Sequence, residues 1–286
     1  MSRKLSILAA LALCLALLCG CTTIATSEWM QNLFPVGDEA VAAQQTGSVD
    51  SSEDKQEVKQ VVTETYTELS SFGLAYQPDY GLQPYNCQSL NNRIIFSFLY
   101  EPLFAVTNTY EAEPILAESY LVTDDGKTTT VKLRSGVTFH DGSALTAADA
   151  AYSIESAAGS EYYGSRLRFI VSAEAQDDLT LVLSTSEAYE CLPLLLDIPI
   201  IKSGTKDAQS PPGTGPYEFA ETKLVRCKSW WRDTAPLVDF DEIALTVSST
   251  AADVRDNFEY QKVNMVLTDP NSSAFAGFHN DYELWN

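Results

Sequence analysis

The sequence predicts a mixed α/β protein built from short strands and helices, and three observations support this fold class. The 286 residues are 45% hydrophobic, which is enough for a packed core and excludes disorder throughout the chain. From about residue 63 onward, segments with strand character alternate with segments whose apolar residues recur at helical spacing. No internal repeat with a period of roughly 20–50 residues is visible, so the sequence does not indicate a solenoid or a propeller.

Residues 1–20 have the pattern of a signal peptide. Arg3 and Lys4 provide a positive start, and the apolar run Leu5–Leu18 is shorter than the roughly 20 residues that a membrane-spanning helix needs. The following Leu18-Cys19-Gly20-Cys21 resembles a bacterial lipobox, which implies lipid attachment to the Cys21 thiol and cleavage before it. The alternative is an uncleaved anchor helix.

Residues 21–62 are predicted to form a flexible acidic tether. From Gly37 on, this stretch is rich in Ser, Gln, Ala, Asp and Glu and has no sustained apolar period. Such a composition cannot offset the entropy of the chain. We therefore expect a signal peptide at 1–20, a tether at 21–62 and a globular body at 63–286.

The first half of the body shows local signals in a clear order. Leu69–Tyr76 has strand character, and Pro78 and Gly81 break the next stretch into a loop that ends at Tyr85. A helix follows, because apolar residues recur three and four apart behind the capping residue Ser89. The elements predicted up to residue 133 are a strand at Leu69–Tyr76, a helix at Ser89–Tyr100, and strands at Leu116–Val122 and Thr128–Leu133 across an Asp124–Lys127 turn.

The second half continues the alternation. Thr146 caps a helix in which Asp149 is placed to reach back in a shortened capping box. Gln209–Tyr217 is rich in Pro and Gly and is predicted to be a turn region. The remaining predicted elements are helices at Thr146–Ala158, Glu190–Leu196 and Thr250–Tyr260, and strands at Leu167–Glu174, Leu179–Ser184, Leu224–Lys228, Ile243–Val247, Val263–Leu267 and Tyr282–Trp285.

Charge and composition exclude several function classes. Eighteen Lys and Arg residues against 39 Asp and Glu give a net charge of −21, whereas a nucleic-acid binder needs a basic face. The only histidines are His140 and His279, which makes histidine catalysis or a histidine-rich metal site a poor hypothesis. The sequence has no GxSxG, HExxH or P-loop motif, and we expect no enzyme and no cofactor.

The cysteines leave two arrangements open. After removal of the signal peptide and lipid attachment to Cys21, the remaining thiols are Cys87, Cys191 and Cys227. They fit either one disulfide plus one free thiol or three buried thiols, and the sequence does not choose a pairing. No CxxC spacing exists, so we expect no zinc site.

Two segments resemble one known family. The first contains Leu99-Tyr100-Glu101-Pro102-Leu103 and then, in order, Leu-Ala-Glu-Ser, Asp-Gly-Lys-Thr, Leu-Arg-Ser-Gly-Val-Thr-Phe-His-Asp-Gly and Leu-Thr-Ala-Ala-Asp within Pro114–Ala157. The second is Gly213-Thr214-Gly215-Pro216-Tyr217 with the downstream pair Trp230-Trp231. Together they resemble the family 5 extracellular solute-binding proteins, the oligopeptide-, dipeptide- and nickel-binding components of ABC importers.

The resemblance implies a periplasmic-binding-protein-like α/β fold of type II. Members of the family close two lobes around a ligand, and here the resemblance covers about Leu69–Trp285, the first lobe with its inserted subdomain. The second lobe, which in peptide-binding members supplies a carboxylate for the peptide amino terminus, has no counterpart in the sequence. The expected function is a substrate-binding lipoprotein of an ABC-type importer, most simply for oligopeptides or dipeptides. The alternative is a structural or sensing lipoprotein that retains half of the fold.

The resemblance also implies partners, location and site residues. We expect a peptide or other small solute, a permease and ATPase complex, and an extracytoplasmic protein held to the bacterial membrane through lipid on Cys21. The residues expected to face the ligand are Tyr76, Gln83, Tyr85, Tyr162, Tyr163, Thr268 and Asp269. We interpret His140-Asp141-Gly142 as a surface turn leading to the Thr146 cap, and Trp230-Trp231 more as core than as a stacking platform.

Overall fold

A computed structural model describes residues 69–232, 236, 238–267 and 278–279, all within the compact unit Tyr66–Asn286. The predicted signal peptide, its Cys21 and the predicted tether lie outside the described residues. The same holds for Thr268, Asp269 and the predicted strand Tyr282–Trp285. In the described part of the chain, no helix has both the length and the apolar character needed to cross a membrane.

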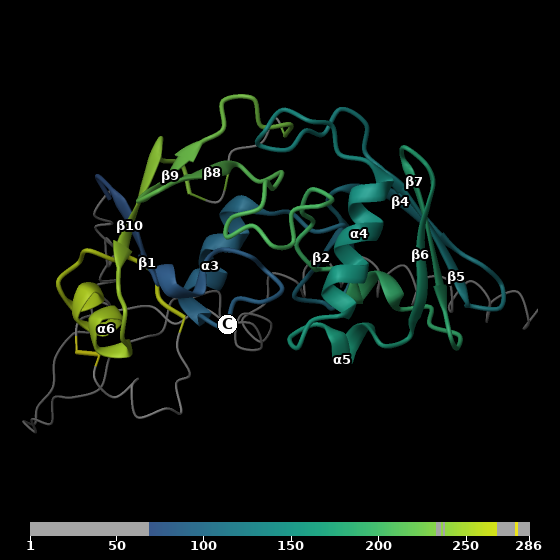
Figure 1. Ribbon diagram of the computed structural model, residues 1–286, viewed down its shortest axis with the longest axis horizontal. Coiled ribbons are helices and arrows are strands. Elements are labelled where there is room, and N and C mark those ends of the chain that lie inside the picture. Colours follow the sequence, from purple (N-terminus) through teal and green to yellow (C-terminus); the bar gives the residue numbers. More distant parts are fainter. Residues whose placement is uncertain (1–68, 233–235, 237, 268–277, 280–286) are drawn as a thin grey trace, which may run out of the picture. The chain divides into compact units, whose positions relative to one another are not determined.

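One four-stranded sheet joins the two ends of the described chain (Figure 1). Its strand order is β1 (Phe72–Tyr76), β10 (Glu242–Val247), β9 (Lys223–Arg226) and β8 (Tyr217–Ala220). β1 and β10 run parallel, with Phe72 opposite Ile243 and Tyr76 opposite Val247. All five residues of β1 are buried, as expected for a strand covered on both faces.

A second four-stranded sheet is antiparallel throughout. Its order is β4 (Ala117–Val122), β5 (Thr128–Leu133), β7 (Thr180–Thr185) and β6 (Ile170–Asp177). Gly126 sits in the β4–β5 turn with φ +67°, a conformation that favours glycine. A small hairpin of β2 (Phe104–Val106) and β3 (Ala112–Pro114) precedes this sheet. The two predicted strand pairs are thus confirmed.

Capping residues set the starts of the main helices. Ser89 accepts a hydrogen bond from Asn92 N at the start of α3 (Leu90–Leu99), which contacts β1 and β8. Thr146 and Asp149 form the predicted capping box of α4 (Ala147–Ala158), which packs on β6 and β7. The other helical elements are η1 (Pro78–Tyr80), α5 (Gly164–Leu167), η2 (Leu192–Leu195) and α6 (Ala251–Glu259), the last with a capping box at Thr250.

Two sequence-based predictions need correction. Val263–Leu267 was expected to be a buried strand, but only Met265 pairs, through a single parallel bridge to Leu74. Val263 is buried, whereas Leu267 is 46% exposed, so the apolar run leaves the core within five residues. The Pro/Gly-rich stretch predicted as a turn up to Tyr217 is followed at once by β8, which the sequence pattern did not indicate.

The Gly213–Gly215 segment packs directly on the end of α3. Gly215 N donates to Leu99 O at 3.0 Å, and Gly213 O accepts from His140 N at 2.9 Å. A Cβ on Gly213 would lie 2.0 Å from Leu99 O, so no larger residue fits without moving the backbone. The glycines of this motif therefore serve close approach between two backbone segments.

The described cysteines are all free thiols: Cys87 is buried, Cys191 exposed and Cys227 half-buried. Neither arrangement left open by the sequence is therefore fully matched, since there is no disulfide among these three and one of them reaches the surface.

Candidate functional site

Three parallel segments end at the same edge of the first sheet. They are β1, which ends at Tyr76, β10, which ends at Val247, and the short segment that bridges to β1 at Met265. Ligands of open α/β sheets bind outside the carboxyl ends of parallel strands. We therefore take this edge as the candidate functional site and call it the carboxyl edge. It comprises Gln77, Tyr80, Leu90, Asn91, Val247, Ser249 and Leu267.

Hydrogen bonds bring these residues together from distant parts of the chain. Gln77 Nε2 donates to Ser249 O at 3.4 Å, which links the ends of β1 and β10. Leu267 N donates to Asn91 Oδ1 at 3.3 Å, which ties the bridging segment to the first turn of α3. The carboxyl edge is thus assembled from four separate stretches of sequence.

Asn92 holds the loop after β1 in place. Its side chain is fully buried, and its Oδ1 accepts from Gln77 N at 2.8 Å. Its Nδ2 donates to Gln77 O and to Gly81 O, both at 2.8 Å. A fully paired buried amide fixes the backbone around it, so the loop at the carboxyl edge is pre-organised before any ligand arrives.

The carboxyl edge combines apolar side chains with uncharged polar groups. The exposed fractions of Tyr80, Leu90, Val247 and Leu267 are 47%, 50%, 55% and 46%. Gln77, Asn91 and Ser249 supply amide and hydroxyl groups among them. Ligand sites of this kind bind through apolar contact and use a few polar groups for orientation.

The predicted ligand-facing residues of the loop are used within the fold. Tyr76 is buried and packs on Phe219 with ring centroids 5.7 Å apart. Gln83 Oε1 accepts from Tyr85 N at 2.7 Å, and the Tyr85 hydroxyl donates to Pro199 O at 2.7 Å. Burial raises the pKa of Tyr85 far above its ordinary value, so the phenol stays neutral. Ligand contact by these three side chains stays a prediction.

The predicted subdomain tyrosines meet the loop and α3 in one aromatic cluster. Tyr163 is buried edge-on against Tyr85 at 6.1 Å and against Tyr162 at 4.8 Å, whereas Tyr162 is 56% exposed. The Arg93 guanidinium lies 3.4 Å from the centroid of the Tyr162 ring. Sequence reasoning missed Arg93 because nothing local distinguishes it, and its aromatic partners lie far along the chain.

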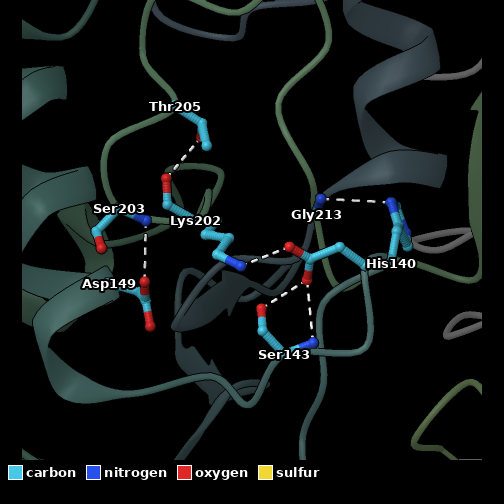
Figure 2. Close-up of polar contacts among 8 residues, drawn as sticks. His140, Ser143, Asp149, Lys202, Ser203, Thr205 and Gly213 are labelled. Carbon is cyan, nitrogen blue, oxygen red and sulfur yellow. Dashed lines mark hydrogen bonds and ion pairs between the residues drawn. The ribbon is translucent and has the colours of Figure 1, made fainter.

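The His140-Asp141-Gly142 segment is a surface turn, as predicted (Figure 2). Gly142 has φ +80°, and the exposed Asp141 carboxylate accepts from Ser143 and pairs with Lys202. The Lys202 hydrogen bond, with help from Ser143, lowers the pKa of Asp141 to about 2. The Asp141 carboxylate is therefore charged at neutral pH and anchors Lys202.

The His140 ring also makes hydrogen bonds within the fold. Its Nδ1 accepts from Gly213 N at 3.3 Å, as Figure 2 shows, and its Nε2 faces Gly215 O at 3.1 Å. Burial lowers the pKa of the imidazole. With both ring nitrogens engaged, His140 has none left to act as a general base. Beside it lies a surface hollow of about 250 Å³ lined by His140, Asp141, Ser210, Pro211, Pro212, Glu218 and Phe219.

Glu101 is a buried carboxylate at the centre of a second structural cluster. Its Oε2 accepts from Trp231 Nε1 at 2.6 Å and from Thr214 Oγ1 at 3.0 Å, and Arg232 lies 3.7 Å from its Oε1. Burial raises the pKa of Glu101. Trp231 packs against the core, which matches the preferred interpretation for this tryptophan. Among the described residues, no group of three or more His, Cys, Asp or Glu side chains could hold a metal ion.

Comparisons with known proteins agree on one family. The profile described as bacterial extracellular solute-binding proteins, family 5 middle, matches residues 111–283. The glutathione-binding protein GsiB of Escherichia coli K12 is 29% identical over 176 residues, which cover 55% of this chain and 34% of that protein. The Pectobacterium atrosepticum protein of the same name is 28% identical over the same shares. The chain therefore spans about a third of the length of these relatives.

Solved structures show the same fold. NikA from Brucella suis, in complex with Fe(III)-EDTA, superposes with a TM-score of 0.55 at 24% identity, over 68% of this chain and 42% of that one. The oligopeptide-binding protein AppA from Bacillus subtilis, in complex with a nonapeptide, gives 0.51 at 20% identity over the same shares. At these sequence identities the similarity shows only that the fold is shared.

Proposed function

Because the chain belongs to the bacterial extracellular solute-binding proteins of family 5, we propose that it binds a peptide at the carboxyl edge and serves an ABC-type importer. The chain is a binding protein and not an enzyme, because its homologues are solute-binding proteins. The observation that carries the proposal is the carboxyl edge itself, where parallel segments end beside exposed apolar and amide groups. Main-chain amides and apolar side chains are the groups that a peptide of varied sequence offers.

Two of the relatives named above support a peptide over other solutes. Glutathione is a tripeptide, and AppA was solved with a nonapeptide. The edge residues Gln77, Asn91 and Ser249 are uncharged, which suits the neutral backbone of a peptide. An alternative ligand class is a metal complex, since NikA carries Fe(III)-EDTA.

Ligand-induced stabilisation of the full chain tests this function. The probes are glutathione and equimolar pools of dipeptides, tripeptides and pentapeptides, with a nickel–histidine complex as the competing class. A ligand at 100 times its Kd stabilises the folded state by about 2.7 kcal/mol, or a rise in Tm of roughly 5–10 °C for a domain of this size. A melting temperature that no peptide pool changes would refute the proposal.

Two matched variants locate the site. Val247 at the end of β10 and Val171 in β6 are both exposed valines on strands, 55% and 69% exposed. Val247→Arg places a bulky charge on the carboxyl edge and should abolish stabilisation by peptides, whereas Val171→Arg should leave it intact. Equal responses of the two variants would mean that peptides bind elsewhere.

We also propose that the protein is a lipoprotein in which residues 1–20 are cleaved, Cys21 carries lipid, and residues 21–62 tether the binding domain to the membrane. The support is the apolar run of Leu5–Leu18 followed by Leu18-Cys19-Gly20-Cys21. Metabolic labelling with radioactive palmitate in the native host should mark the wild-type protein and not Cys21→Ser. Labelling of that variant would show that Cys21 is not the acceptor.

A further inference from the structure

Arg93 is a cation that lies against an aromatic ring beside the carboxyl edge. It is half-buried in the first turns of α3, and none of the ion pairs in the described part of the chain includes it. Its Nη2 donates to Cys87 O at 3.1 Å, which leaves most of its N–H donors without a carboxylate to bind. With 39 acidic residues in the sequence, an arginine in this state is an available anion-binding group.

Its position is fixed by aromatic rings. The guanidinium lies 3.4 Å from the centroid of Tyr162 and 6.0 Å from that of Tyr163. Tyr163 is itself buried against Tyr85, so the stack rests on the core. Hydrogen bonds to Cys87 O and to the Tyr163 side chain use only some of the N–H donors of the guanidinium, so the others are open to a partner.

The neighbouring Arg166 shows the contrast. It packs on the same Tyr163 ring at 5.3 Å, but it is paired with Asp197 and donates to Leu195 O at 3.0 Å. Two arginines thus flank one tyrosine pair, and only one of them is neutralised within the described residues. The free charge is the one beside the exposed Tyr162 ring.

Arg93 adjoins the carboxyl edge. It lies three residues after Leu90 of that edge on α3, and residues three apart share one face of a helix. A ligand that covers Leu90 can therefore extend along this face of α3 toward the guanidinium.

We propose that Arg93, stacked on Tyr162, binds a carboxylate of the ligand. Arginine pairs with carboxylates through two parallel N–H···O bonds, and the exposed Tyr162 ring covers the apolar part of the same group. This inference rests on the proposed peptide-binding function and adds an acidic anchor to it. The carboxylate comes either from the peptide C-terminus or from an acidic side chain.

The experiment compares three pools of tetrapeptides by titration calorimetry with the full chain. One pool lacks Asp and Glu and has free C-termini, the second is identical but C-terminally amidated, and the third is amidated and carries one Glu. We expect the wild type to bind the free-acid pool at least about tenfold more tightly than the amidated pool, the smallest effect of a hydrogen-bonded charge pair. Recovery of affinity by the Glu-containing pool would assign the carboxylate to a side chain.

Variants connect the preference to Arg93. Arg93→Gln should reduce the ratio between free-acid and amidated pools to less than about twofold. Arg168→Gln is the matched control, because Arg168 also stacks on a ring, Phe169 at 4.7 Å, but is exposed. Arg93→Lys keeps the charge without the planar fork and should retain part of the ratio.

The outcomes separate the two proposals. If the wild type binds all three pools equally well, the Arg93 anchor is refuted and peptide binding stands. An Arg93→Gln variant that keeps the preference also refutes it. If no pool binds the wild type, peptide binding fails and the anchor fails with it. Because the three pools are compared on the wild type, the proposal can be refuted even if Arg93→Gln misfolds.

Discussion

Gly213→Ala is predicted to destabilise the protein strongly, through a backbone clash and not through loss of a side-chain contact. A Cβ at this position would lie 2.0 Å from Leu99 O and 2.5 Å from Cδ1 of Tyr100. A carbonyl oxygen cannot rotate away as a side chain can, so the Gly213–Gly215 segment must move off the end of α3. This movement breaks the bonds from Gly215 N to Leu99 O and from His140 N to Gly213 O.

The magnitude follows from those losses. Two hydrogen bonds contribute roughly 0.5–1.5 kcal/mol each, and forced overpacking costs roughly 1–3 kcal/mol, which together give about 2–6 kcal/mol. That is a large share of the roughly 5–15 kcal/mol that stabilises an ordinary domain. Because α3 also carries Asn91 and Arg93, the variant should weaken peptide binding even at temperatures where it stays folded.

Urea denaturation followed by tryptophan fluorescence measures the loss. Gly204→Ala is the matched control, because Gly204 has φ +80° and a Cβ there would meet nothing within 4 Å. Its cost is backbone strain alone, roughly 1–2 kcal/mol. If Gly213→Ala loses no more free energy of unfolding than Gly204→Ala, the close-approach explanation is wrong.

Three further predictions follow from buried groups. Burial raises the pKa of Glu101 above its ordinary value of 4.5. Between pH 4.5 and this raised pKa, the folded state therefore binds more protons than the unfolded state, and the stability of the wild type falls as the pH rises. In urea denaturation, the free energy of unfolding of Glu101→Gln relative to that of the wild type should therefore be higher at pH 8 than at pH 4. The same difference between the two proteins at both pH values would contradict this. Asn92→Ala removes three hydrogen bonds of a buried side chain and should lower the free energy of unfolding by about 2–4 kcal/mol, with a matching fall in peptide affinity. An unchanged urea midpoint would show that the loop does not depend on Asn92. Alkylation of the native protein followed by peptide mapping should label the exposed Cys191 and spare the buried Cys87, whereas equal labelling would refute the described burial.

Local signals predicted the helices well. Ser89 and Thr146 are capping residues followed by apolar residues at helical spacing, and both start helices where expected. The Asp124–Lys127 turn likewise predicted the β4–β5 hairpin. These features succeed because the groups that decide them lie within a few residues of one another.

Elements that depend on distant partners were less predictable. The apolar run Val263–Leu267 is a good strand former, yet it forms only one bridge to β1, between Met265 and Leu74, beside the hydrogen bond from Asn264 N to Gly73 O. The strand β8 exists because it pairs with β9, although its sequence follows a Pro/Gly-rich turn. Sequence shows the propensity of a segment, whereas pairing is decided by neighbours brought in by the rest of the fold.

The candidate site shows the same division. The loop after β1 is predicted to line the ligand site, and its residues Gln77 and Tyr80 lie at the carboxyl edge. Gln83 and Tyr85 of the same loop hydrogen-bond within the fold. Asn92 and Arg93 were not singled out, because their roles arise from contacts with Gln77 and Tyr162. Only the three-dimensional arrangement reveals which polar residues remain available to a ligand.

The electrostatics of the chain explain how one arginine can set the selectivity of the proposed site for a carboxylate. A net charge of −21 repels anionic ligands at long range, but salt screens this field beyond roughly 8 Å at physiological ionic strength. A guanidinium in contact with a carboxylate is screened far less, because the contact excludes water and the Tyr162 ring covers one face. Selectivity for a carboxylate would therefore arise at contact, from one guanidinium that pairs with no carboxylate among the described residues, against the charge of the molecule as a whole. An Arg93 neutralised by an internal acid, as Arg166 is by Asp197, could not do this.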